Sequence, residues 1–145
     1  MEREDLLKIY APDQDSKQLQ PLAESSVSAG FPSPADDFAG LKLDLNKELV
    51  KNPASTFYAR VSGVSMVDEG IDDGDLLVID KSVEPLDGSL AVCFVDGEFT
   101  LKRFSDRGDH GLLIPANSDY QPIRVSAEND FQIWGVVRYI IKKMI

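Results

Sequence analysis

Cysteine is almost absent from the chain, since Cys93 is the only one among 145 residues. A single cysteine cannot form an internal disulfide or build a cysteine-based metal cluster. This composition suits a reducing compartment, so we expect a cytoplasmic protein. We also predict that the protein holds no metal ion and needs no cofactor.

The chain also lacks a long apolar segment. The first residues, Met1 to Asp5, have neither the basic start nor the apolar stretch of a signal peptide. No apolar run approaches the length needed to cross a membrane. We therefore expect a soluble, unexported protein that makes no membrane contact.

Basic residues are scarce. The chain has 15 Lys and Arg against 25 Asp and Glu, which gives a formal net charge of -10. Nucleic-acid affinity rests largely on basic contacts with the phosphate backbone. Direct binding to nucleic acid is therefore not expected, whereas binding to proteins that are themselves on DNA stays open.

Composition divides the chain into an arm and a body. Residues 1–40 are rich in Ser, Pro, Gln, Asp and Glu and hold too few apolar residues to fold alone. We interpret them as an extended N-terminal arm, and residues 41–145 as a single β-rich domain. At the start of this domain, Leu43 to Val50 predicts a short helix with Asp44 as its N-cap, which Pro53 ends.

The pattern from Thr56 onward is that of strands, because β-branched and aromatic runs alternate with Gly, Asp and Pro turn signals. The spacing predicts a mainly β fold, a small barrel or twisted sandwich. Asp96-Gly97 joins two such runs and predicts a type I′ hairpin turn. We place strands near Phe57–Ser62, Leu76–Ile79, Leu90–Val95, Phe99–Phe104, Leu112–Pro115, Ile123–Val125 and Phe131–Ile141.

Ser65 lies where a strand-like run gives way to a turn, in the segment Val61 to Gly70. A serine at such a place can present its hydroxyl, and nearby backbone N–H groups can stabilise an oxyanion. A serine that merely caps a turn is the commoner occurrence. The segment lacks the second glycine of the nucleophile elbow, which argues against an α/β-hydrolase.

A serine nucleophile needs a general base, and two residues are candidates. His110 is the only histidine, but its polar turn sequence is typical of an exposed histidine. Lys102 lies inside the run Glu98 to Phe104, and Ser-Lys pairs are an established variant of the catalytic triad. A lysine acts as a base only if burial lowers its pKa from about 10.4 to near 7, which takes roughly 4 to 5 kcal/mol. The alternative is an edge-strand lysine with its ammonium in water.

Five separated motifs carry a resemblance to a known family. The motifs are Gly30-Phe31-Pro32-Ser33-Pro34-Ala35, Ser62-Gly63-Val64-Ser65-Met66, Gly74-Asp75-Leu76-Leu77-Val78-Ile79-Asp80, Asp96-Gly97-Glu98-Phe99-Thr100-Leu101-Lys102 and Pro115-Ala116-Asn117-Ser118. In order and spacing they resemble the UmuD proteins of the LexA-like self-cleaving serine peptidases, over roughly residues 28–145. The resemblance implies a mostly β, SH3-like twisted barrel or sandwich.

The resemblance also implies roles for four residues. Ser65 would be the nucleophile, Lys102 its base, and the cut bond would join Ala29 to Gly30. It implies slow self-cleavage stimulated by a RecA filament on single-stranded DNA. The cleaved form, as a homodimer, would join a UmuC-like Y-family polymerase for translesion synthesis in the SOS response.

Two departures from the family pattern leave other functions open. Ala29 stands where UmuD proteins often have cysteine. LexA and phage repressors cut at Ala-Gly, so an alanine at this position is compatible with cleavage, and the substitution does not predict the rate. The arm, Met1 to Ser28, has no helix-turn-helix pattern, which disfavours a repressor.

One alternative is a mainly non-catalytic polymerase-accessory dimer whose arm position switches partners. Another is a signal-peptidase-like enzyme, which ordinarily needs a membrane anchor.

Three further residues are given structural interpretations. Cys93 lies within Leu90 to Val95, where a buried structural cysteine is expected. Trp134 and Tyr139 in the last strand are interpreted as core or dimer contacts.

Overall fold

The computed structural model describes residues 6–12, 19–23 and 38–145. The chain forms two compact units, one of residues 1–12 and 52–145 and the other of residues 13–51. The boundary between residues 40 and 41, expected from composition, remains a prediction. Among the described residues, no helix combines the length and the apolar character needed to cross a membrane.

The smaller unit contains a two-stranded antiparallel sheet and one short helix. Strand β2 (Leu19–Ala23) pairs with β3 (Phe38–Asp44), and helix α1 (Leu45–Leu49) follows directly. The N-cap prediction for Asp44 is confirmed, because its Oδ1 accepts a hydrogen bond from the backbone N–H of Asn46 at 3.0 Å. Pro53 starts the 3-10 helix η1 (Pro53–Ser55).

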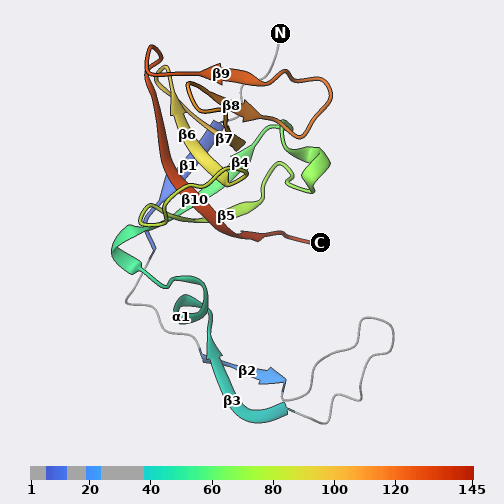
Figure 1. The fold of residues 1–145 in the computed structure, drawn as a ribbon. Helices are drawn as coiled ribbons and strands as arrows, with labels where there is room; N and C mark the ends of the chain where they lie inside the picture. The colour runs from blue at the N-terminus through green and yellow to red at the C-terminus, as the bar shows by residue number, and fades with distance from the viewer. Residues whose placement is uncertain (1–5, 13–18, 24–37) are drawn as a thin grey trace. The chain divides into compact units, whose positions relative to one another are not determined.

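The larger unit is built on one eight-stranded antiparallel sheet in the order β1-β4-β5-β10-β6-β7-β8-β9. In Figure 1 the long strand β10 runs between β5 and β6. All seven strands predicted from the sequence are present, with ends within two residues of the predicted ones. Their bounds are β4 Thr56–Ser62, β5 Leu76–Asp80, β6 Leu90–Val95, β7 Glu98–Asp106, β8 Gly111–Ile114, β9 Ile123–Val125 and β10 Phe131–Ile141.

Three strands lie in or reach into the part of the chain where the sequence predicted none. Besides β2 and β3, strand β1 (Leu6–Tyr10) joins the large sheet by pairing with β4. These strands lie in or border a polar segment without clear alternation. Apolar and polar side chains alternate along a strand only where one of its faces is buried. The pairing partner of β1 is some fifty residues away, so the residues next to β1 in sequence do not predict the strand.

The core covers both faces of the central strands. Alternate residues of β6 belong to different apolar clusters: Leu90 and Val92 to one, Ala91 and Cys93 to the other. The sheet curls enough for β1 to contact β7. It nevertheless keeps two edges, β1 and β9, so the barrel of the sequence prediction is not closed. The sandwich form of the prediction, and the mainly β class, are confirmed.

The turn predicted at Asp96-Gly97 is confirmed. Asp96 has φ 47° and Gly97 has φ 91°, the two positive values that a type I′ turn requires. The turn aligns Val95 with Glu98, which sets the register that places Lys102 opposite Ala91.

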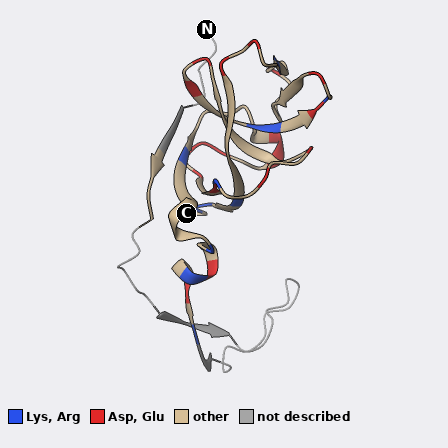
Figure 2. Cartoon of the chain, turned by 60° about the vertical axis from the view of Figure 1, so that its left-hand side comes forward, with Lys and Arg blue, Asp and Glu red and all other residues tan. Residues whose placement is uncertain are grey.

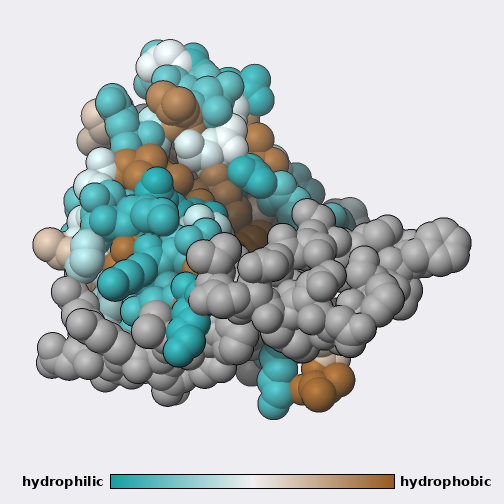
Figure 3. Space-filling model, turned by 90° about the horizontal axis from the view of Figure 1, so that it is seen from below, coloured by the Kyte–Doolittle hydropathy of each residue, from teal (hydrophilic) through white to brown (hydrophobic). Residues whose placement is uncertain are grey.

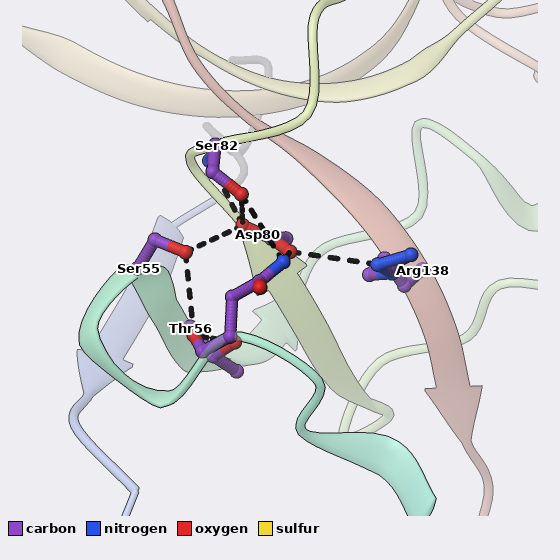
Figure 4. A network of polar contacts seen from close by, with 6 residues as sticks. Ser55, Thr56, Asp80, Ser82 and Arg138 are labelled. Atoms are coloured by element: carbon purple, nitrogen blue, oxygen red, sulfur yellow. Dashed lines mark hydrogen bonds and ion pairs between the residues drawn. The ribbon is translucent and has the colours of Figure 1, made fainter.

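Asp80, at the end of β5, is a buried carboxylate held by a network of hydrogen bonds (Figure 4). Asn52 Nδ2 donates to its Oδ2 at 2.8 Å, and Ser55 Oγ donates to its Oδ1 at 2.8 Å. Ser82 donates from its backbone N–H at 2.8 Å and from its hydroxyl at 2.6 Å. Arg138 of β10 approaches Oδ2 at 3.5 Å. The network thus joins residues before β4, after β5 and in β10.

Candidate active site

Ser65 lies in the turn between β4 and the 3-10 helix η2 (Val67–Glu69). The turn begins at Gly63, whose φ of 113° is one that residues with a side chain rarely adopt. The backbone N–H of Gly63 donates to Asp73 Oδ1 at 2.9 Å. Ser65 itself is only 1% exposed. The turn therefore presents the serine to the interior and not to bulk water.

The segment after β8 holds the Ser65 turn from the other side. The N–H of Ala116 donates to the carbonyl of Ser65 at 2.8 Å, and the N–H of Asp68 donates to the carbonyl of Ala116 at 2.7 Å. Asn117 Nδ2 donates to the carbonyl of Val64 at 2.8 Å. Sequence reasoning gave Ala116 and Asn117 no role, although both lie in one of the motifs that carry the resemblance.

Lys102 lies on β7, facing the same side of the sheet as Ala91 and Cys93 of the neighbouring strand. It is 4% exposed. Its Nζ lies 2.9 Å from Ser65 Oγ and 2.6 Å from Thr100 Oγ1, as donor to both hydroxyls. The structure thus brings together the two residues singled out from the sequence and adds Thr100, which sequence reasoning did not single out.

This arrangement can support proton transfer. Burial disfavours the charged form of an amine. An uncharged amine at hydrogen-bond distance from a hydroxyl can accept its proton as that oxygen attacks a carbonyl. Thr100 Oγ1 restricts where the amine can point, because it accepts a hydrogen bond from the same nitrogen. Among the described residues, no three His, Cys, Asp or Glu side chains are grouped to hold a metal ion.

Apolar side chains flank Ser65 on the surface. Val64 is 46% exposed and Val67 is 38% exposed, although Met66 between them is buried in the core. Figure 3 shows that apolar side chains interrupt the hydrophilic surface on the face drawn there. Exposed valines beside a buried serine are suited to contact an apolar or extended peptide.

An ion pair links the strand of Lys102 to the helix after Ser65. Arg103 Nε donates to Glu69 Oε1 at 2.8 Å, and Arg103 also donates to the carbonyl of Gly88 at 3.0 Å. Both charged side chains are partly exposed, so the pair contributes little to stability.

The other candidate base, His110, contacts an aspartate instead of the serine. His110, in the turn between β7 and β8, has its Nδ1 2.6 Å from the carboxylate of its neighbour Asp109. The carboxylate of Asp109 is exposed, and its hydrogen bond with His110 lowers the pKa of that carboxyl. The structure places Lys102, not His110, against the Ser65 hydroxyl.

Cys93 lies fully buried on the same face of the sheet as Lys102. Burial raises the pKa of the Cys93 thiol to about 12, although a charge on Lys102 acts in the opposite direction. This agrees with the structural interpretation of Cys93. Trp134 packs against Phe57 and Phe99 at the core, and Tyr139 is 38% exposed.

Cys93 is therefore expected to resist thiol reagents in the folded protein. At pH 8 the thiolate fraction of a thiol with a pKa near 12 is about one in ten thousand, and the side chain is inaccessible. Colorimetric titration with an aromatic disulfide should detect no reaction over an hour and one equivalent after denaturation. Rapid reaction of the native protein would contradict this burial.

The bond expected to be cut joins Ala29 to Gly30. Ala29 and Gly30 lie outside the described residues. The pairing of Ser65 with Lys102 is thus described, while the position of the bond expected to be cut remains a prediction from the sequence.

Comparison with known proteins identifies the family of the chain. Residues 21–138 match the family described as Peptidase S24-like. Protein ImpA of Escherichia coli is 40% identical over 132 residues, which cover 91% of this chain and 90% of ImpA. Protein SamA of Salmonella typhimurium is 40% identical over 139 residues, 95% of this chain and 96% of SamA. LexA repressor 2 of Pseudomonas syringae is 36% identical over 117 residues, 81% of this chain and 57% of the repressor. The resemblance seen in the sequence is confirmed, and the chain belongs to the S24-like peptidase family.

Proposed function

We propose that the chain is a self-cleaving serine peptidase in which Ser65 attacks the Ala29-Gly30 bond with Lys102 as general base. The observation that carries this proposal is the hydrogen bond of 2.9 Å between Lys102 Nζ and Ser65 Oγ in a buried setting. Family membership supports a serine peptidase, and Ser65 and Lys102 lie in the sequence motifs that carry the resemblance.

The proposed reaction proceeds in two steps. Uncharged Lys102 takes the proton from Ser65 Oγ as this oxygen bonds to the carbonyl carbon of Ala29. The same proton passes to the nitrogen of Gly30 as the peptide bond breaks, which leaves Ala29 as an ester on Ser65. Water then hydrolyses the ester, with Lys102 again as base. The backbone N–H of Ser65 is a candidate donor to the oxyanion.

The arrangement of arm and body is part of the proposal. The bond to be cut lies in the arm, residues 1–40, of the same chain that carries Ser65. The attack is therefore intramolecular and avoids the entropy cost of binding a separate substrate. Small residues at Ala29 and Gly30 suit a close approach to a buried hydroxyl. The exposed valines Val64 and Val67 offer an apolar surface for the segment around the cut.

The proposed cellular role rests on the resemblance to the family. We propose that a RecA filament on single-stranded DNA stimulates cleavage in the cytoplasm, as part of the SOS response. The cleaved form then acts as a homodimer and as an accessory subunit of a UmuC-like Y-family polymerase. The charge of -10 supports a role without direct DNA contact. Figure 2 shows the Lys and Arg positions of the described residues scattered along the ribbon among the Asp and Glu positions.

Intact mass spectrometry tests the position of the cut. The full chain, incubated at alkaline pH or with an activated RecA filament, is expected to yield two fragments, residues 1–29 and 30–145. Their masses must sum to that of the full chain plus one water. A cut at another bond, or a chain that stays full length under both conditions, would refute the proposal.

Asn117 is expected to position the nucleophile. Replacing it with alanine removes the hydrogen bond to the Val64 carbonyl and loosens the turn beside Ser65. Small misplacements at a reacting atom cost up to about 100-fold in rate, so we expect Asn117→Ala to slow self-cleavage by about 10- to 100-fold. The exposed neighbour Ser118 provides a control, since Ser118→Ala should cut at the parental rate. A time course on denaturing gels measures both, and equal rates would contradict the role of Asn117.

A further inference from the structure

Strand β1 is an edge strand whose covalent attachment depends on the bond proposed to be cut. It pairs with β4 through five residue pairs, from Leu6 opposite Ser62 to Tyr10 opposite Tyr58, and no strand of the described residues lies on its other side in the sheet. The chain between β1 and β4 contains the Ala29-Gly30 bond. A cut there leaves β1 attached to the body by non-covalent contacts alone.

Ile9 and Tyr10 are the residues of β1 whose side chains the structure describes. Ile9 packs against the larger core cluster, opposite the buried Ala59, while Tyr10 is 49% exposed. Before the cut, the tether keeps β1 at a high effective concentration beside β4, and after it the same contact becomes bimolecular. The fragment of residues 1–29 is then held only by the pairing of β1 with β4 and of β2 with β3, so we expect it to leave when the protein is dilute.

The departure of β1 exposes a long sheet edge. Strand β4 has seven residues, Thr56–Ser62, and loses its pairing partner on one side. An unpaired edge of this length is a template for another strand. The opposite edge of the sheet, β9, has only three residues. Since β1 also contacts β7 and its Ile9 packs against the larger core cluster, its departure uncovers part of that cluster as well.

We propose that self-cleavage turns the edge of β4 into a docking site for an extended segment of a partner protein, which pairs antiparallel with β4 in the place of β1. This inference rests on the proposed function. Strand β1 defines the ligand, namely about five residues with a branched apolar side chain at the place of Ile9. Backbone hydrogen bonds supply affinity, and the apolar side chain opposite the small Ala59 sets the register.

A second copy of the chain fits this edge less well. In a symmetric pairing of two β4 strands about Ala59, each copy offers the other an alanine where β1 offers Ile9. The space that the isoleucine fills would then stay empty, and unfilled apolar space is destabilising. A strand with its own branched residue is therefore the favoured occupant.

A chain that is cut independently of Ser65 tests the inference. The full chain carries Ser65→Ala and a recognition sequence for a site-specific protease in place of residues 26–32. The probe is a fluorescent synthetic peptide with the sequence of residues 5–12, and binding is measured by anisotropy before and after the cut. The cut chain, freed of its N-terminal fragment by gel filtration, should bind the peptide saturably. The affinity of the uncut chain for the peptide should be lower by about ten-fold or more.

Two altered peptides test the register. The affinity of an Ile9→Asp peptide for the cut chain should be lower by about ten-fold or more. This is the loss expected when a buried isoleucine is replaced by a charge. A Tyr10→Thr peptide, changed at the exposed neighbour, should bind like the parent. Hydrogen exchange adds a second readout: the amides of β4 should lose protection after the cut and regain it when the peptide is added.

Several results would overturn the inference. They are equal binding to the cut and the uncut chain, a fragment that stays bound while the peptide does not bind, and self-association of the cut chain without peptide binding. Unfolding of the cut chain, seen by circular dichroism, would overturn it too, because β1 would then be part of the core. None of these results depends on Ser65, so they leave the proposed self-cleavage to be decided by the mass measurement.

Discussion

Replacing Ser65 with alanine is expected to leave the chain at full length under conditions in which the parent chain cuts itself. The substitution removes the oxygen that forms the ester, and loss of a catalytic serine lowers rates on the order of a million-fold. Intact mass spectrometry after incubation with activated RecA filaments measures the result. Ser118→Ala, at an exposed serine, serves as the control. Parental cutting by Ser65→Ala would exclude Ser65 as the nucleophile.

Lys102 allows a sharper test, because stability and activity should move in different directions. Lys102→Met removes a buried amine and keeps the volume of the side chain, so it is expected to be neutral or stabilising. It also removes the base, so self-cleavage should be lost. Lys102→Arg introduces a group that stays positively charged and cannot accept a proton, so this variant should be inactive as well.

The parent chain should cut faster as pH rises, because the amine must be uncharged to accept a proton. The residual rate of Lys102→Met should lack this dependence. Lys143→Met, at an exposed lysine near the C-terminus, should behave as the parent in rate, pH profile and melting temperature. A Lys102→Met chain that melts like the parent and still cuts at the parental rate would refute the assignment of the base.

Asp80→Ala is expected to be the most destabilising of the substitutions considered. The carboxylate is 1% exposed and accepts hydrogen bonds from Asn52, Ser55 and Ser82 (Figure 4). Its removal leaves these donors without their acceptor, and breaking a buried charged network costs about 3 kcal/mol. Urea unfolding monitored by Trp134 fluorescence measures the change. Asp130→Ala, at an exposed aspartate, should change the free energy of unfolding by less than about 0.5 kcal/mol.

Asp80 also predicts how stability depends on pH. Burial alone raises the pKa of the Asp80 carboxyl, but hydrogen bonds from Ser82, Asn52 and Ser55 outweigh it and hold that pKa well below its usual range. A pKa depressed in the folded state stabilises the fold above the unfolded value of about 3.9, and this contribution is lost as pH falls below it. The difference in stability between the parent and Asp80→Ala should therefore shrink below pH 4. A difference that stays constant down to pH 2 would contradict the network.

The sequence by itself determined the local structure and the residues of interest. Runs of β-branched and aromatic residues mark the strands from β4 to β10 because one or both faces of each strand are buried. Asp96-Gly97 marks its turn and Asp44 its helix because these depend on residues next to one another. Ser65 and Lys102 stand out only because family motifs surround them, since an isolated serine or lysine is usually structural.

Only the tertiary structure decided which of these residues meet. Ser65 and Lys102 are 37 positions apart. Their hydrogen bond exists because the β6–β7 hairpin places Lys102, and hydrogen bonds from Ala116 and Asn117 hold the turn of Ser65. The pairing of β1 with β4, the open edges of the sheet and the burial of Asp80 likewise depend on distant parts of the chain. Pattern and propensity describe neighbours in sequence, whereas contacts between distant strands depend on how the whole sheet packs.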